Sequence, residues 1–226
     1  MSIWVLTDRH QAARPLTEVV RAAVDGGAST VLLREKDLPR AERFALAEQL
    51  RAVIPVGRAR LIVAGPDPLG GDAIHLAAGD PPAPAGGQPG LIGRSCHHDA
   101  ELAGLTTEDY ALVSPFQPTP SKPEYGPPLG PDGLAALVRQ SPVPVIALGG
   151  ISTADHVRGA LAAGAVGVAI QGAIMRADDP AALVAELLAA ARTVETSGAV
   201  HARPARVPRQ WGGSRDGVPG ALASAR

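Results

Sequence analysis

Residues 143–174 read VPVIALGGISTADHVRGALAAGAVGVAIQGAI, and this stretch decides the fold. An apolar run from Val143 to Leu148 precedes two glycines, an alanine-rich stretch from Ala154 to Ala163, and a second apolar run from Gly167 to Ile170. Short runs of Val, Ile and Leu that alternate with helical stretches indicate parallel strands buried on both faces and covered by helices. The stretch therefore predicts a strand, a helix and a second, parallel strand.

The same unit recurs along the chain. The predicted strands are Ile3 to Leu6, Thr30 to Arg34, Leu61 to Val63, Ala73 to Leu76, Leu91 to Ser95, Tyr110 to Ser114, Val143 to Leu148 and Gly167 to Ile170. The predicted helices are Leu16 to Asp25, Arg40 to Val53, Asp99 to Leu105, Pro131 to Arg139, Ala154 to Ala163 and Ala181 to Val194, with weak or absent helices after the third and fourth strands. Gly26 and Gly164 are expected in the left-handed position at helix ends. Eight strands at this length favour a closed α/β barrel, the (β/α)₈ TIM barrel, over an open sheet.

Composition limits the partners. The chain has 226 residues, 46% of them hydrophobic, with a formal net charge of -1. Nothing in this balance attracts nucleic acid or a membrane surface, so we expect small-molecule partners or further copies of the chain in a homo-oligomer. Cys96 is the single cysteine, and no signal peptide or membrane span is recognisable, so we predict a cytoplasmic protein. Residues 1–195 are predicted to form the barrel, and residues 196–226, rich in Gly, Pro and Arg, a disordered tail.

Polar residues that follow the predicted strands are the candidate site, because barrels of this type carry their chemistry at the carboxyl ends of the strands. Arg34 and Lys36 are two residues apart on an extended strand end and so share a side, whereas Glu35 points away. Two cations at a barrel opening invite an anion, although a solvated surface cluster is an equal alternative. The glycine turns after strands seven and eight hold the residues expected to bind a phosphate through backbone N–H groups, namely Gly149, Gly150, Gln171 and Gly172.

Four further side chains have less specific patterns. His75 lies within a predicted strand and is interpreted as structural. Cys96 is interpreted as a small buried hydrophobic residue rather than a nucleophile. His97 and His98 follow a strand, and their spacing does not indicate a metal site.

Seven motifs occur in order along the chain: VLTDR (Val5 to Arg9), LREK (Leu33 to Lys36), HLAAGD (His75 to Asp80), IGRSCH (Ile92 to His97), SPFQPTPSKP (Ser114 to Pro123), ALGGI (Ala147 to Ile151) and GVAIQGAI (Gly167 to Ile174). Taken together, they resemble the thiamine phosphate synthase/TenI superfamily. The members of this superfamily are TIM barrels, so the resemblance implies the same fold as the strand count.

The synthase branch joins a hydroxymethylpyrimidine diphosphate to a thiazole phosphate with Mg²⁺, releasing pyrophosphate. The diphosphate leaves first, and the thiazole nitrogen captures the pyrimidine methyl cation, so this transferase needs cations and positioning rather than a strong base. The resemblance implies that Arg34, Lys36, Ser95 and Lys122 contact the diphosphate and that Asp80 binds Mg²⁺. It also implies that Thr119 and Ser121, on a proline-stiffened loop, face the thiazole phosphate, which Gly149, Gly150, Gln171 and Gly172 cradle.

The sequence departs from the superfamily's pattern at several points. The Asn-Asp-Arg expected after the third strand, whose Asp is a Mg²⁺ ligand, is replaced by Ala64, Gly65 and Pro66, and Asp67 is the nearest substitute. The usual glutamine before LREK is Leu32.

Two alternatives to the synthase remain. One is a metal-free, TenI-like thiazole tautomerase, whose proton-transferring histidine aligns with Pro115, so that His97 or His98 would take that role. The other is a non-catalytic phosphate-binding relative.

Overall fold

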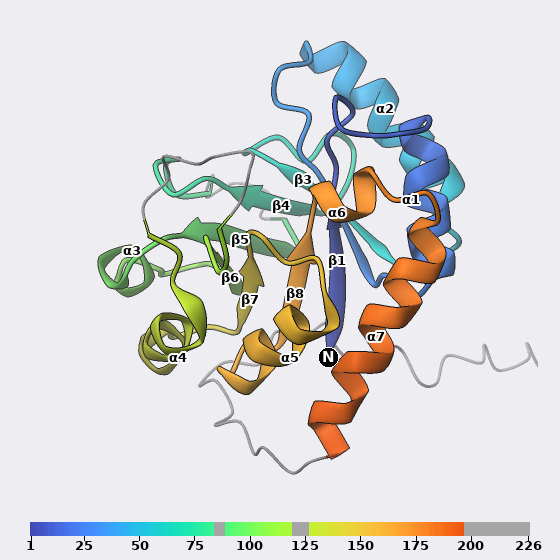
Figure 1. The fold of residues 1–226 in the computed structure, drawn as a ribbon. Coiled ribbons are helices and arrows are strands. Elements are labelled where there is room, and N and C mark those ends of the chain that lie inside the picture. Colours follow the sequence, from blue (N-terminus) through green and yellow to red (C-terminus); the bar gives the residue numbers. More distant parts are fainter. Residues whose placement is uncertain (84–88, 119–126, 197–226) are drawn as a thin grey trace, which may run out of the picture.

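Eight parallel strands form a closed barrel in the computed structural model, which describes residues 1–83, 89–118 and 127–196 (Figure 1). Each strand pairs with the next, and β1 pairs with β8, where Ile3 lies opposite Val168. The predicted (β/α)₈ TIM barrel is therefore confirmed. The strands are β1 (Ser2–Leu6), β2 (Thr30–Leu33), β3 (Arg60–Ala64), β4 (Ala73–Leu76), β5 (Leu91–Cys96), β6 (Tyr110–Val113), β7 (Val145–Leu148) and β8 (Gly167–Ile170).

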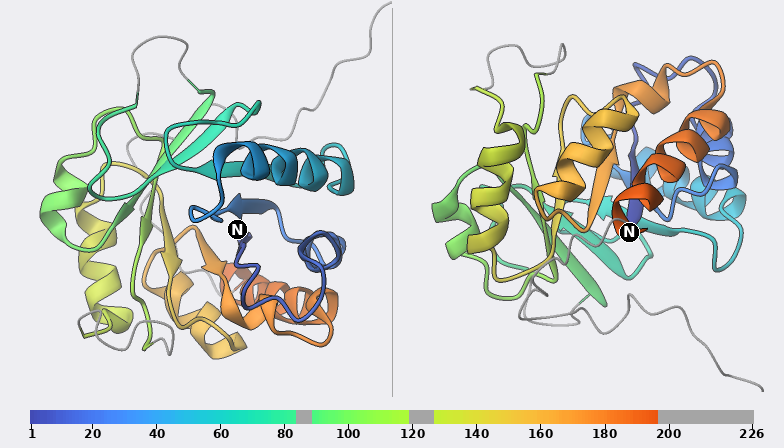
Figure 2. Two further views of the ribbon diagram at one scale, coloured as in Figure 1. Left: turned by 90° about the horizontal axis from the view of Figure 1, so that it is seen from above. Right: turned by 60° about the horizontal axis from the view of Figure 1, so that its bottom comes forward.

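Helices surround most of the barrel (Figure 2). They are α1 (Leu16–Asp25), α2 (Arg40–Val53), α3 (Asp99–Ala103), α4 (Gly130–Gln140), α5 (Ala154–Ala162), α6 (Gly172–Met175) and α7 (Pro180–Thr196). The described segments after β3 and β4, where weak or absent helices were predicted, contain no helix, and Ala83 packs on the outward side chains Ile74, Leu76 and Ile92. Across the described residues, no helix has the length and apolar character needed to cross a bilayer.

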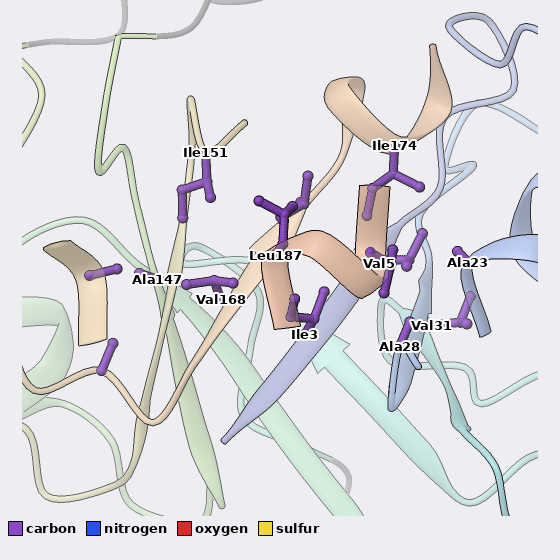
Figure 3. Close-up of a cluster of buried hydrophobic side chains, with 14 of the residues drawn as sticks. Ile3, Val5, Ala23, Ala28, Val31, Ala147, Ile151, Val168, Ile174 and Leu187 are labelled. Atoms are coloured by element: carbon purple, nitrogen blue, oxygen red, sulfur yellow. The ribbon is translucent and has the colours of Figure 1, made fainter. Parts of the chain in front are cut away.

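Side-chain alternation along the strands produces two cores. One set, which includes Ile3, Val5 and Val168, points outward and packs with helix residues such as Leu187 (Figure 3). The alternate set fills the barrel itself and includes Trp4, Leu6, Leu32, Ile62, Tyr110, Leu112, Ile146 and Ala169. Since side chains two apart on a strand share a face, residues that continue the second set past the strand ends line the carboxyl-end opening of the barrel. This alternation positions the site.

The boundaries correct the sequence-based expectations in a few places. Strand β2 ends at Leu33, so Arg34 lies just beyond it. Strand β7 starts after Pro144, which lacks a backbone N–H for the ladder. The short helix α6 was not among the predicted helices.

The two helix-end glycines differ from each other. Gly164 has a φ of 99°, the left-handed conformation that was predicted. Gly26 is right-handed with a φ of -69°, and Gly27 (φ 108°) takes the left-handed position instead. Gly26 serves close packing, because a Cβ there would lie 2.4 Å from the carbonyl oxygen of Ala181 in α7.

Candidate functional site

Arg34 and Lys36 present exposed side chains at the carboxyl end of β2, and Glu35 between them is buried. The Arg34 backbone N–H donates to the Thr7 hydroxyl (3.0 Å), which ties the end of β2 to the end of β1. The expected separation of Glu35 from the two cations is therefore confirmed. Within the described residues, neither the Arg34 nor the Lys36 side chain forms an ion pair.

Arg9 holds the acidic side chains of this segment. Its backbone N–H and Nη1 donate to Glu35 (3.1 and 2.9 Å), and its guanidinium also donates to both carboxylate oxygens of Asp37 (2.8 and 2.5 Å). The hydrogen bonds from Arg9, and then from His10, keep the pKa of Asp37 well below its ordinary value. Both carboxylates beside Arg34 and Lys36 are thus already paired with another cation.

Ser95, a predicted diphosphate contact, lies at the end of a hydrogen-bonded chain inside the barrel. Its hydroxyl lies 2.9 Å from Nε2 of His75, and Nδ1 of His75 lies 3.1 Å from the hydroxyl of Tyr110. The rings of His75 and Tyr110 stack with centroids 5.6 Å apart, and Trp4 meets Tyr110 edge-on. His75 is therefore in direct contact with a predicted site residue.

Burial lowers the pKa of His75 to about 3, and the positive charges of Lys36 and Arg94 act in the same direction. The charge of Asp80 opposes them. The imidazole is therefore neutral at physiological pH, and it lies close enough to sense charges at the carboxyl-end opening.

Asp80, the predicted magnesium ligand, lies on a tight loop after β4. Its Oδ2 accepts from the backbone N–H of Ala77 (2.7 Å), and its own N–H donates to the Ala77 carbonyl oxygen (3.1 Å). Arg94 donates to the carbonyl oxygens of Ala77 (2.9 Å), Asp80 (2.6 Å) and Pro81 (3.2 Å). Arg94 is itself held by a buried ion pair with Glu108 (2.6 Å). Arg94 thus holds the loop that carries Asp80 through hydrogen bonds to its carbonyl oxygens, and we call this contact the Arg94 clamp.

Asp67, the nearest candidate for the missing carboxylate, lies on the loop after β3. One of its oxygens pairs with Arg40 (2.6 Å), and the other accepts from the Leu69 N–H (2.9 Å). The Arg43 guanidinium donates to the carbonyl oxygen of Ala64, and its buried Nε has no hydrogen-bond partner among the described residues. Asp67 as a substitute Mg²⁺ ligand therefore stays a prediction, and binding an ion would compete with these hydrogen bonds.

The described residues contain no cluster of three or more His, Cys, Asp or Glu side chains that could hold a metal. Asp80 supplies one carboxylate, which fits a Mg²⁺ ion that takes its remaining ligands from phosphate oxygens and water.

Gly149 and Gly150 form a left-handed turn after β7, with φ values of 103° and 65°. The loop after β6 packs on this turn: the Phe116 N–H donates to the Leu148 carbonyl oxygen (2.8 Å), and the Gln117 N–H donates to that of Gly149 (3.0 Å). A Cβ on Gly150 would lie 2.5 Å from the carbonyl oxygen of Pro118. The predicted contacts Thr119, Ser121 and Lys122 come next in the chain and lie outside the described residues.

Gln171 and Gly172 follow β8 and form the start of α6. The Gln171 side-chain amide donates to Asp8 (3.1 Å), whose same oxygen accepts from Gln11 (2.5 Å). A Cβ on Gly172 would lie 2.8 Å from the Gln11 amide oxygen. The side chain of Gln171 is thus committed to the β1 loop, which leaves backbone groups of the turn for a ligand.

Cys96, His97 and His98 lie at the end of β5 and differ in their burial and contacts. Cys96 is buried, and burial raises the pKa of its thiol to about 12, which agrees with its interpretation as a small core residue. Nδ1 of His97 lies 2.9 Å from the Ser114 carbonyl oxygen, so this nitrogen carries the proton. His98 is exposed and lies near Glu101.

Reasoning from the sequence missed the supporting residues Tyr110, Arg94 and Glu108, and it assigned His75 a structural role. The signal for His75 was its two-residue spacing from Ala73, which faces the barrel interior. The signal for Arg94 was a charge in the middle of an apolar strand, where only a paired ion is tolerated.

These features define a (β/α)₈ barrel whose polar side chains gather at the carboxyl ends of the strands, where barrel enzymes carry their active sites. The family model for thiamine monophosphate synthase matches residues 3–174. A protein of Geobacter sulfurreducens is 41% identical over 199 residues, covering 83% of this chain and 93% of that protein. The thiamine-phosphate synthase of Roseiflexus sp. is 36% identical over 191 residues, covering 80% of each chain.

A solved structure agrees with these relatives. The thiamine phosphate pyrophosphorylase of Pyrococcus furiosus superposes with a TM-score of 0.72 at 28% identity, covering 85% of this chain and 96% of that chain. The chain belongs to the thiamine monophosphate synthase family. The predicted resemblance and the predicted transferase class are thereby confirmed.

Proposed function

We propose that the chain is a thiamine-phosphate synthase that joins hydroxymethylpyrimidine diphosphate to a thiazole phosphate. The bond from the pyrimidine methylene carbon to the diphosphate oxygen breaks, and its electron pair leaves with pyrophosphate. The thiazole nitrogen then donates its lone pair to the methylene carbon, so the new C–N bond forms without any proton transfer. This chemistry suits a site that has cations but no strong base.

The observation that carries the proposal is the pair Arg34 and Lys36. Both are exposed at the carboxyl end of β2, and neither is neutralised by a described carboxylate. The charge of Lys36 is felt by His75, which is bonded to Ser95, so both strand ends border one opening. In the proposal Arg34, Lys36 and Ser95 hold the diphosphate as its negative charge grows.

We assign Mg²⁺ to Asp80 together with diphosphate oxygens and water. When bound, the ion neutralises charge on the leaving pyrophosphate. Its protein support is one carboxylate on a loop that Arg94 holds rigid. Because Asp67 is engaged elsewhere, we expect weak Mg²⁺ binding without the diphosphate and strong binding with it.

The thiazole phosphate is assigned to the turns after β7 and β8. The first N–H groups of a helix have no partner within the helix, so those at the start of α6 can donate to a phosphate together with the Gly149–Gly150 turn. Thr119, Ser121 and Lys122 complete the proposed site from the loop anchored on that turn. Gln171 shapes the turn through its bond to Asp8.

The test is to incubate the purified chain with both substrates and Mg²⁺ and to measure thiamine phosphate and pyrophosphate. Arg34→Ala is expected to lower kcat/KM about a hundredfold, as expected for losing one charge that stabilises the transition state. The matched control is Arg58→Ala, because Arg58 is also exposed but precedes β3 at the opposite end of the barrel.

Absence of product at high enzyme concentration would overturn the proposal. A thiazole tautomerisation assay in EDTA would then distinguish the tautomerase alternative from a non-catalytic relative. The tautomerase alternative requires His97, whose Nδ1 is bonded to the Ser114 carbonyl oxygen, or the exposed His98.

A further inference from the structure

Three neighbouring strands contribute one polar side chain each to the interior of the barrel. His75 comes from β4, Ser95 from β5 and Tyr110 from β6. His75 bonds to Ser95 through Nε2 (2.9 Å) and to Tyr110 through Nδ1 (3.1 Å), so both ring nitrogens are used. His75 and Tyr110 are buried, whereas Ser95 is half-buried at the edge of the site.

Gly93 makes this contact between non-adjacent strands possible. It lies on β5 opposite His75 on one side and opposite Tyr110 on the other. A Cβ on Gly93 would lie 1.9 Å from the Cζ of Tyr110, so the ring occupies the space that any other residue would fill. The tyrosine hydroxyl thereby reaches across β5 to the imidazole.

The hydrogen bonds that join Tyr110, His75 and Ser95 determine which group donates in each of them. Among the described residues, Nδ1 of His75 is the only partner of the Tyr110 hydroxyl, and a buried O–H without an acceptor is costly. Tyr110 therefore donates to Nδ1, which must be unprotonated. A neutral imidazole then carries its proton on Nε2, and this N–H donates to Oγ of Ser95. The Ser95 hydroxyl hydrogen is left to donate away from His75.

We propose that His75 and Tyr110 are positioning residues that hold Ser95 as a donor toward a bound anion. The inference rests on the proposed function, because it takes that anion to be the diphosphate. In the opposite tautomer the Ser95 hydroxyl would donate to His75 and would present only lone pairs to the diphosphate. Only the tautomer with its proton on Nε2 of His75 leaves the Ser95 hydroxyl free to donate to the diphosphate.

The surroundings keep this arrangement constant with pH. Burial lowers the pKa of His75 to about 3, with Lys36 and Arg94 acting in the same direction and Asp80 opposing them. Burial also raises the pKa of Tyr110 well above its ordinary value. Neither group changes its protonation between about pH 5 and 9, so the hydrogen-bond direction does not change either.

The first test is spectroscopic and independent of activity. In the ¹⁵N-labelled full chain, the imidazole nitrogen shifts of His75, identified by their absence in His75→Gln, should show Nδ1 unprotonated and Nε2 protonated from pH 5 to 9. In Tyr110→Phe the two tautomers should mix, because Nδ1 has lost its donor. Trp4→Phe is the matched control, since it alters packing beside Tyr110 and removes only the Trp4 hydrogen bond to Ser2, leaving both hydrogen bonds of His75, and it should leave the shifts unchanged. A protonated Nδ1 in the wild type overturns the inference.

The second test is a double-mutant cycle on turnover. Tyr110→Phe is expected to lower kcat/KM about tenfold in the wild type and to have almost no effect in a Ser95→Ala background, because it acts through Ser95. Equal effects in both backgrounds would mean a general structural role and would refute the inference. An inactive wild type with the expected tautomer would overturn the proposed function and the diphosphate as the anion, while leaving the tautomer assignment in place.

Discussion

Arg94→Met should remove the hydrogen bonds from Arg94 to the Asp80 loop and destabilise the barrel. The variant leaves Glu108, whose side chain is 4% exposed, without the cation that lies 2.6 Å from it. Breaking a buried ion pair by deleting one partner costs about 3–5 kcal/mol. We expect a loss of this size in the free energy of unfolding, measured by urea denaturation at pH 7.

The pH dependence of this loss follows from Glu108. Burial alone would raise its pKa, but hydrogen bonds from Arg94 and from backbone N–H groups of Thr106 and Thr107 outweigh burial and hold it below the ordinary value. A lowered folded-state pKa contributes stability above the unfolded-state pKa, and this stability is lost as the pH falls through the folded-state value. Without Arg94, burial raises the pKa of Glu108, so the variant takes up a proton at a higher pH than the wild type. The difference between wild type and Arg94→Met should therefore be largest at neutral pH and shrink as the pH falls.

A second substitution separates the ion pair from the clamp. Arg94→Met combined with Glu108→Leu removes both charges, and most of the lost stability should return because no unpaired carboxylate remains. The carbonyl oxygens of Ala77, Asp80 and Pro81 still lack their donor. Amide exchange at Ala77 and Asp80 should therefore stay faster than in the wild type, and kcat/KM should stay roughly ten- to a hundredfold lower.

Two results would refute this reasoning. A loss below about 1 kcal/mol at pH 7, or an equal loss at pH 4 and pH 7, would show that the pair is not a buried charge pair in solution. Full recovery of turnover in the double variant would show that the Asp80 loop needs no clamp.

Three further predictions concern single positions. Gly93→Ala should cost about 1–3 kcal/mol or more, because its Cβ would meet the Tyr110 ring at 1.9 Å, and an unchanged Tm would contradict this packing. Cys96 should resist a thiol reagent at pH 8 in the native protein and react in urea, because burial raises its pKa to about 12; rapid native labelling would be inconsistent with a buried thiol. Gly150→Ala should cost more than Gly57→Ala in urea unfolding, because both have a positive φ but only Gly150 would also clash with a carbonyl oxygen; equal costs would mean that strain alone matters.

The sequence was sufficient for the barrel because its strands are buried on both faces. Continuous apolar runs such as Ile3 to Leu6 indicate buried parallel strands, and the recurring strand–helix unit indicates their order in the barrel. The alternation rule also separated Arg34 and Lys36 from Glu35. Both inferences use only local spacing, which the sequence displays directly.

The supporting residues of the site were harder to predict, because they depend on pairs far apart in the chain. His75 and Tyr110 are 35 residues apart, and Arg94 and Glu108 are 14 apart. Their contacts follow from strand register and from the missing side chain of Gly93, neither of which a local pattern reveals. The same limit applies to Asp67, whose engagement with Arg40 on α2 is a tertiary contact.

The arrangement of charges at the carboxyl end of β2 explains how two cations stay available to a ligand. The segment Arg34 to Asp37 holds two acids and two bases. Arg9 from the β1 loop pairs with both acids, so neither acid neutralises Arg34 or Lys36, whose side chains stay exposed. Glu35 is buried by the same contact, with its side chain 2% exposed, and so cannot turn toward either cation. A net charge near zero for the whole chain is therefore compatible with a locally positive site, because the neutralising acids are held by a third base.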